Sequence, residues 1–219
     1  MDTLELVIGN KAYSSWSLRP WLALKHAGVS FSETRISLYL PGSRKELLRH
    51  AGSGKVPVLK HGASSIWDSL AICEYLAERF PAAHLWPESV AERAEARSIS
   101  AEMHSGFTNI RGTMPFNCRG RGRQVTRTQD VDNDIKRVEE IWNGCRGRHQ
   151  TQGPWLFGRF TIADAMFAPV ALRFVTYGVE LTGLAREYMD TVETHPPVQE
   201  WIAAAREEPE VIESSEVGK

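Results

Sequence analysis

A proline inside a short strand-like run constrains this chain more than any other feature. The run is Gly54-Lys55-Val56-Pro57-Val58-Leu59. Proline cannot donate a hydrogen bond to a sheet ladder, so it belongs at a sheet edge or a break, and X-Pro is the peptide bond that adopts the cis form at low cost. We expect a cis Val56-Pro57 bond that turns the N–H and C=O of Val56 outward, toward an extended peptide-like ligand. An ordinary edge-strand proline is the alternative.

A second motif, Asp68-Ser69, opens an amphipathic pattern that runs to Phe80 and stops at Pro81. The N–H groups at a helix N-terminus favour a carboxylate. We therefore expect Val56 and the Asp68-Ser69 pair to bind two ends of the same ligand.

The first part of the chain alternates strand-like and helical patterns. Strands are expected at Leu4–Ile8, Phe31–Leu38, Val56–Lys60 and Ser64–Trp67, and helices at Ser17–Ala27, Arg44–His50 and Ser69–Phe80. Gly28 is a typical residue just after a helix. The order βαβαββα predicts an α/β unit built on a small mixed sheet.

The second part is helical throughout. Pro81–Pro87 has the composition of a linker, and helices are expected at 89–111, at 128–146, from the capping box Thr161-Ile162-Ala163-Asp164 onward, and at 198–206. The polar tail, residues 207–219, is expected to fray. The pattern predicts an α/β domain at residues 1–82 and an all-α domain at 88–219.

Charge and cysteine content exclude several function classes. A net charge of −1 gives no general attraction to nucleic acid or an anionic membrane, and no run approaches the roughly 20 apolar residues of a membrane-spanning helix. Cys73, Cys118 and Cys145 are widely spaced, which fits a reducing compartment and predicts neither a disulfide framework nor a metal site. The basic run from Arg119 to Arg123 fits a flexible loop, or a loop that attracts anionic substrates.

Together these motifs resemble the cytosolic glutathione S-transferases, from about Leu4 to Arg206. That family joins a thioredoxin-like N-terminal domain, with a cis-proline and an acid-serine pair, to an all-helical domain with a Ser/Thr-x-x-Asp capping box. Ser14-Ser15-Trp16-Ser17-Leu18-Arg19 resembles the zeta-class signature Ser-Ser-Cys-Ser-x-Arg and its bacterial relatives. Trp16 stands where the signature has cysteine, which argues against zeta-type isomerase chemistry more than against glutathione binding.

The resemblance implies glutathione as co-substrate and assigns residues to it. Ser14 would stabilise the thiolate with Ser15 in support, although Tyr13 or Ser15 could supply the hydroxyl instead, and these serines could simply cap a helix. The glutathione-binding set is Ser14, Arg19, Lys55, Val56, Pro57, Asp68 and Ser69, and the second-substrate set is Trp16, Met103, Phe107 and Arg111. Arg19 could instead pair with an acid across the domain boundary, and Lys55 could be a solvated loop lysine. Helical spacing also allows Met103 and Phe107 to be core residues.

These observations predict a cytoplasmic, homodimeric glutathione transferase that conjugates glutathione to a small electrophile, as in detoxification. The alternatives are a glutathione-dependent cis–trans isomerase of the maleylacetoacetate type and a non-catalytic glutathione-binding module. Neither nucleic acid nor membrane is expected as a partner.

Overall fold

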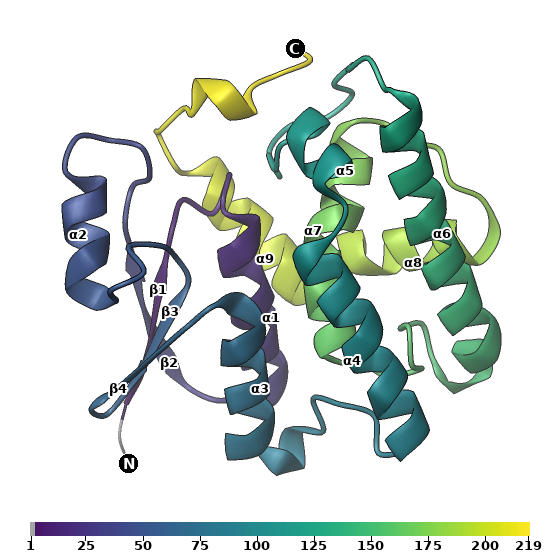
Figure 1. The fold of residues 1–219 in the computed structure, drawn as a ribbon, viewed down its shortest axis with the longest axis horizontal. Coiled ribbons are helices and arrows are strands. Elements are labelled where there is room, and N and C mark those ends of the chain that lie inside the picture. The colour runs from purple at the N-terminus through teal and green to yellow at the C-terminus, as the bar shows by residue number, and fades with distance from the viewer. Residues whose placement is uncertain (1–2) are drawn as a thin grey trace.

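The computed structural model describes residues 3–219 and places a small sheet with its helices beside a helical bundle (Figure 1). The first part contains β1 (Leu4–Ile8), α1 (Ser15–Ala27), β2 (Phe31–Arg35), α2 (Ser43–His50), β3 (Val58–His61), β4 (Ser64–Trp67) and α3 (Ser69–Arg79). The second contains α4 (Val90–Ser105), α5 (Thr108–Thr113), α6 (Gln129–His149), α7 (Ile162–Thr176), α8 (Gly183–Thr194) and α9 (Pro196–Arg206). The predicted βαβαββα order and the helical second part are confirmed.

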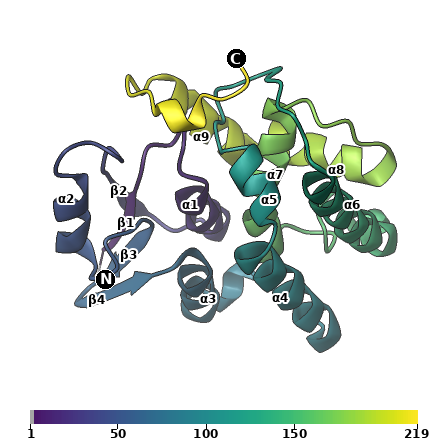
Figure 2. The ribbon, with the colours of Figure 1, turned by 45° about the horizontal axis from the view of Figure 1, so that its top comes forward.

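The sheet has the strand order β2-β1-β3-β4, with β1 parallel to β2 and antiparallel to β3. The helix α2 lies on the outer face, and α1 and α3 lie between the other face and the bundle (Figures 1 and 2). Side chains alternate between the faces of β1: Val7 packs under α2, whereas Leu6 and Ile8 join the main core. This fold is thioredoxin-like and brings the end of β1 close to the bundle.

The helix α7 is the buried centre of the bundle and packs against α1. The predicted capping box begins it: Asp164 Oδ2 accepts hydrogen bonds from the Thr161 N–H at 2.8 Å and the Thr161 hydroxyl at 3.1 Å. Asp164 Oδ1 also accepts from the Leu156 N–H at 3.1 Å. The box therefore fixes both the start of α7 and the loop before it.

The prediction of a single helix at 89–111 is wrong. The chain forms α4 and then restarts as α5, because Gly106 leaves helical geometry and Phe107 takes φ +54°. The N-cap residue of α5, Phe107, makes no side-chain capping hydrogen bond. Asp134 of α6 caps the helix instead, by accepting from the N–H groups of Asn109 and Ile110 at 3.1 and 3.2 Å.

The helix α8 was not expected from the sequence. Thr182 precedes it without a side-chain capping bond. Asn143 of α6 instead accepts a hydrogen bond from the Ala185 N–H at 3.0 Å. Both unexpected helix starts thus depend on residues far away in the sequence.

The expectation of a fraying tail and a free Arg119–Arg123 loop is also wrong. Arg119 donates to the carbonyl oxygens of Glu208 and Glu210 at 2.7 and 3.0 Å. Arg123 pairs with the carboxylate of Glu216 and donates to Val217 O. The basic loop therefore holds the tail against the molecule.

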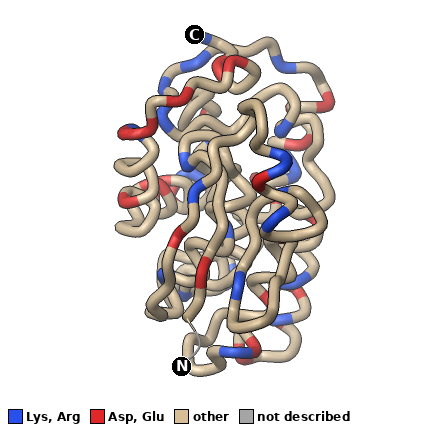
Figure 3. The backbone as a smooth tube through the Cα atoms, turned by 90° about the vertical axis from the view of Figure 1, so that its left-hand side faces the viewer, with Lys and Arg blue, Asp and Glu red and all other residues tan. Residues whose placement is uncertain are grey.

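Acidic and basic positions are interspersed along the backbone (Figure 3). Within residues 3–219, no helix combines the length and the apolar character needed to cross a bilayer.

Candidate functional site

The loop between β1 and α1 carries the serine cluster. Ser14, not Ser17, is the N-cap of α1, so the helix begins two residues earlier than expected. The hydroxyl oxygens of Ser14 and Ser17 lie 2.7 Å apart, and Ser17 Oγ accepts from the Gly9 N–H at 3.2 Å. When Ser17 donates its proton to Ser14, the Ser14 proton is left for a ligand at the N-terminus of α1.

The neighbouring hydroxyls are differently engaged. Tyr13 donates to Glu216 Oε1 at 2.7 Å and accepts from Arg119. Burial and the bond to Glu216 raise the Tyr13 pKa. Ser15 Oγ accepts from Arg173 at 3.4 Å. Ser14 and Ser15 are therefore the hydroxyl groups of this loop that can still donate to a ligand at the N-terminus of α1.

The Val56-Pro57 bond is cis, as predicted, and Asp68-Ser69 opens α3. Asp68 has the unusual φ of +76°, and its Oδ1 accepts from the N–H groups of Leu70 and Ala71 at 2.9 and 3.3 Å. A non-glycine residue held at positive φ marks a position where surrounding contacts outweigh a local cost.

The remaining glutathione candidates, Ser69, Arg19 and Lys55, lie in different surroundings. Ser69 is buried and accepts from Arg19 Nη1 at 3.4 Å, which links α3 to α1. Lys55 is exposed to solvent.

Trp16 is the centre of a stack between the two parts of the molecule. The Arg19 guanidinium lies 4.3 Å from one of its ring centroids and the Arg111 guanidinium 5.5 Å. His104 of α4 meets the indole edge-on at 5.3 Å. Of the second-substrate candidates, the structure brings together Trp16 and Arg111.

Met103 and Phe107, the other two candidates, lie in the hydrophobic core. Met103 exposes 0% of its surface and Phe107 7%. Cys73, Cys118 and Cys145 are likewise buried, and burial is the main cause that raises each thiol pKa to about 12. In the described part of the chain, no three His, Cys, Asp or Glu side chains gather in a way that could hold a metal ion.

Arg173 is a candidate residue that the sequence analysis did not single out. It is 4% exposed on α7, donates from Nε to Met114 O at 2.8 Å, and leaves its buried Nη1 without a partner. The signal was present: Asp164 and Arg173 are the charged residues of an otherwise apolar α7 sequence, and Asp164 is explained by the capping box.

Three guanidinium groups thus surround the Ser15–Trp16 position without an acidic partner. Across residues 3–219, neither Arg19, Arg111 nor Arg173 forms a salt bridge, and Arg19 Nε is a second unpartnered buried donor. Burial, then the charges of Arg173 and Arg111, lower the Arg19 pKa to about 9. Burial and the charge of Arg111 lower the Arg173 pKa to about 10. All three stay cationic at neutral pH and favour a ligand anion.

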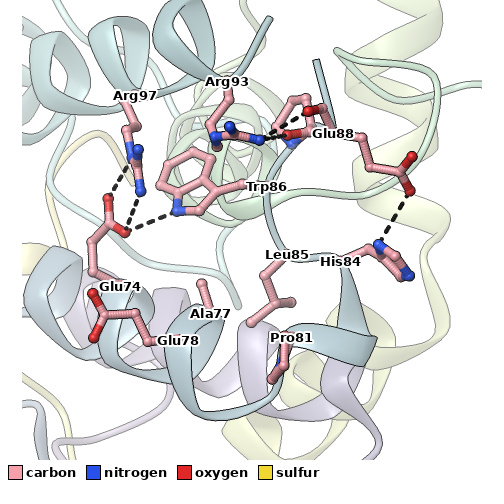
Figure 4. Close-up of a pocket in the computed structure, with 11 residues that line it drawn as sticks. Glu74, Ala77, Glu78, Pro81, His84, Leu85, Trp86, Glu88, Arg93 and Arg97 are labelled. Carbon is pink, nitrogen blue, oxygen red and sulfur yellow. Dashed lines mark hydrogen bonds and ion pairs between the residues drawn. The ribbon is translucent and has the colours of Figure 1, made fainter. Parts of the chain in front are cut away.

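A pocket of about 250 Å³ at the domain linker is not part of this site (Figure 4). Its arginines are already engaged: Arg97 donates to Glu74, which also accepts from Trp86 Nε1, and Arg93 donates to two linker carbonyls. It offers no group comparable to the unpaired arginines.

Two family models match this chain, in the order of its two parts. The family model for the glutathione S-transferase N-terminal domain matches residues 13–79, and the model for the C-terminal domain matches residues 127–204. Maleylacetoacetate isomerase of Mus musculus is 30% identical over 172 residues, 77% of this chain and 76% of that protein, and the Rattus norvegicus protein is 27% identical over the same length.

A solved glutathione transferase homologue from Burkholderia, with bound glutathione, shares the fold. Its TM-score is 0.72 at 22% identity, over 95% of this chain and all of that chain. The two domain matches in order, the mouse relative and the site between the domains lead to one assignment: this chain belongs to the glutathione S-transferase family.

Proposed function

We propose that this glutathione-dependent enzyme uses Ser14 to favour the glutathione thiolate. The thiolate then attacks a small electrophile that carries a carboxylate. The role of Ser14 is argued from its position as the N-cap of α1. A thiol with an ordinary pKa of about 8.5 is only a few per cent ionised at neutral pH, and lowering that pKa by two units requires about 2.7 kcal/mol. A hydroxyl proton from Ser14 and the N-terminus of α1 are suitable sources.

The rest of glutathione would lie where the chain enters β3 and α3 begins. The Val56 backbone next to the cis-proline suits the peptide part of the ligand. The Ser69 hydroxyl accepts from Arg19, so its own proton is left for a ligand carboxylate at the start of α3. Lys55 is an exposed cation on the same chain segment. We also propose a cytoplasmic homodimer, as the family resemblance implies.

The carboxylate of the second substrate is supported by one observation: buried Arg19 and Arg173 and half-buried Arg111 lie together, and none of the three forms a salt bridge within the described residues. Burying an unpaired cation costs free energy that a ligand anion recovers. Arg173 presents an unpartnered N–H group and contacts Ser15, next to the proposed thiolate position. An anionic electrophile held there would lie beside the sulfur.

The test compares 4-chloro-3-nitrobenzoate with its methyl ester as electrophiles. We expect the wild type to prefer the acid, and Arg173→Met to lower kcat/KM for the acid about 30-fold or more, as for loss of a charge-assisted contact, while the ester rate changes little. Arg137→Met, which removes an exposed arginine on α6, is the matched control. Equal losses for acid and ester would refute a carboxylate role.

The role of Ser14 has a separate test. We expect Ser14→Ala to return the pKa of bound glutathione toward its free value, measured by thiolate absorbance against pH. A depressed thiol pKa that survives this change but not Ser15→Ala would assign the hydroxyl to Ser15.

Isomerisation is the second candidate function, because the rat and mouse relatives are named maleylacetoacetate isomerases. An isomerase would return the thiol after bond rotation, so glutathione would not be consumed with a cis-alkene acid substrate. Stoichiometric loss of glutathione with that substrate identifies conjugation.

A further inference from the structure

The loop that leads to Ser14 is held by the far end of the chain. After α9, the tail runs over the end of the molecule where β1 leads into α1 (Figure 2). The loop itself is a tight turn, since Asn10 O accepts from the N–H groups of Tyr13 and Ser14 at 3.1 and 2.8 Å. Each of the three residues between Asn10 and Ser14 contacts either the tail or a residue that binds the tail.

Glu208 makes the most direct contact. One carboxylate oxygen accepts from the Lys11 N–H at 2.7 Å, and the other accepts from the Ala12 N–H at 3.0 Å. Two successive backbone N–H groups form a small anion-binding nest, and Glu208 is 8% exposed in it. Charged acceptors make hydrogen bonds about twice as strong as neutral ones, so this contact fixes the backbone two residues before Ser14.

The carbonyl groups of the same two residues also accept hydrogen bonds. Trp201 Nε1 of α9 donates to Lys11 O at 2.8 Å, and the Cys118 N–H donates to Ala12 O at 3.1 Å. Both the N–H and the C=O groups of Lys11 and Ala12 are therefore hydrogen-bonded.

Glu216 adds a second point of attachment at Tyr13. Its carboxylate accepts from the Tyr13 hydroxyl, from Arg123 and from Asn117. Burial opposes ionisation of this group, but the hydrogen bonds from Arg123, Tyr13 and Lys219 outweigh it and lower the Glu216 pKa to about 2. The carboxylate is charged at every pH where the enzyme would work.

These contacts point to a role in the reaction and not only in folding. Fixing a catalytic group removes freedom that would otherwise have to be lost at the transition state, and small misplacements have large effects on rate. We propose that Glu208 is a positioning residue that holds the Ser14 loop in its active geometry through the N–H groups of Lys11 and Ala12. The proposal rests on the proposed role of Ser14.

The test uses Glu208→Gln, with Glu207→Gln as the matched control. In the same position, a glutamine side chain places an NH2 donor, instead of an acceptor oxygen, against one of the two N–H groups. The neighbouring Glu207 is exposed and its side chain forms no hydrogen bond or salt bridge within the described residues, so its variant carries the same charge change without the loop contact. The full-length proteins are compared by amide hydrogen exchange, thermal unfolding, the pKa of bound glutathione and steady-state kinetics.

We expect Glu208→Gln to speed amide exchange at residues 11–14, raise the pKa of bound glutathione and lower kcat about tenfold with little change in the KM for the electrophile. Glu207→Gln should match the wild type. Unchanged exchange at residues 11–14, or faster exchange there with wild-type kcat and thiol pKa, would overturn the positioning role.

Failure of the proposed function gives a different result. If Ser14→Ala leaves the thiol pKa and kcat unchanged, the role of Ser14 is wrong, while the exchange and kcat of Glu208→Gln still decide whether Glu208 positions the loop for catalysis. A fall in Tm that accompanies faster exchange throughout the protein would assign Glu208 to stability alone.

Discussion

His104 Nε2 of α4 lies 3.1 Å from Asp68 Oδ2, so the carboxylate that caps α3 also joins the two parts of the molecule. Burial, followed by the charges of Arg19 and Arg111, lowers the His104 pKa despite the opposing charge of Asp68. Neutral His104 must then carry its proton on Nε2 to donate to the carboxylate.

The His104–Asp68 contact predicts an effect on glutathione affinity. We expect His104→Phe to weaken glutathione binding about fivefold, the value of a hydrogen bond that orients a charged group, because Asp68 loses its cross-domain partner. His104→Gln keeps a donor and should retain most of the affinity. Titration calorimetry measures both, and equal affinities for His104→Phe and the wild type would contradict the prediction.

The buried arginines predict a gain in stability at the expense of function. Arg19→Met should leave the free energy of unfolding unchanged or raise it by about 1–2 kcal/mol, because an unpaired buried cation is replaced by an apolar chain of similar length. Denaturant unfolding measures the change, and glutathione affinity should fall in the same variant. A loss of more than about 2 kcal/mol would show that stacking on Trp16 and the bond to Ser69 outweigh burial.

His195 predicts a specific acid sensitivity. It packs against Trp155 and Phe160, and burial followed by the charge of His26 lowers its pKa to about 4. The unfolded chain takes up this proton near pH 6.5 and the folded chain only near pH 4, so stability is lost as the pH falls between these values.

We expect His195→Gln to remove about 1–2 kcal/mol of that loss, after allowance for partial solvent screening. Unfolding curves at pH 7.5 and 5 test it, with exposed His84→Gln as the control. Parallel pH profiles for His195→Gln and the wild type would rule it out.

Asp164 makes stability depend on pH in the opposite direction to His195. Burial raises its pKa to about 6 despite the hydrogen bonds it accepts from Leu156 and Thr161, so the stability that its protonated form contributes is present at low pH and lost as the pH rises through 6. Asp164→Ala should destabilise the fold by about 2 kcal/mol at pH 8 and by more at pH 5. Urea unfolding at both values tests this against exposed Asp130→Ala.

The features that the sequence predicted are those with local causes. The cis bond follows from Val56-Pro57, the cap of α3 from Asp68, and the start of α7 from Thr161 and Asp164, which are three positions apart. In each case the residue that determines the local backbone structure is part of that same turn or helix start.

The features that escaped prediction depend on distant partners. The start of α5 needs Asp134, and the order of the tail needs Arg119 and Arg123. The position of Arg173 in an apolar helix indicates that it is buried, but its contact with Ser15 is visible only when α7 is placed beside α1.

The bond between Tyr13 and Glu216 spans 203 positions of sequence, which sets an order of events during synthesis. At roughly 5–20 residues per second, a ribosome takes on the order of 10–40 s to progress from one partner to the other. The segment that ends in Ser14 is made well before Glu216, so the hydrogen bond from Tyr13 forms only after another 203 residues have been added. A nascent chain that has released only its N-terminal domain therefore carries a serine loop without the contacts that fix it.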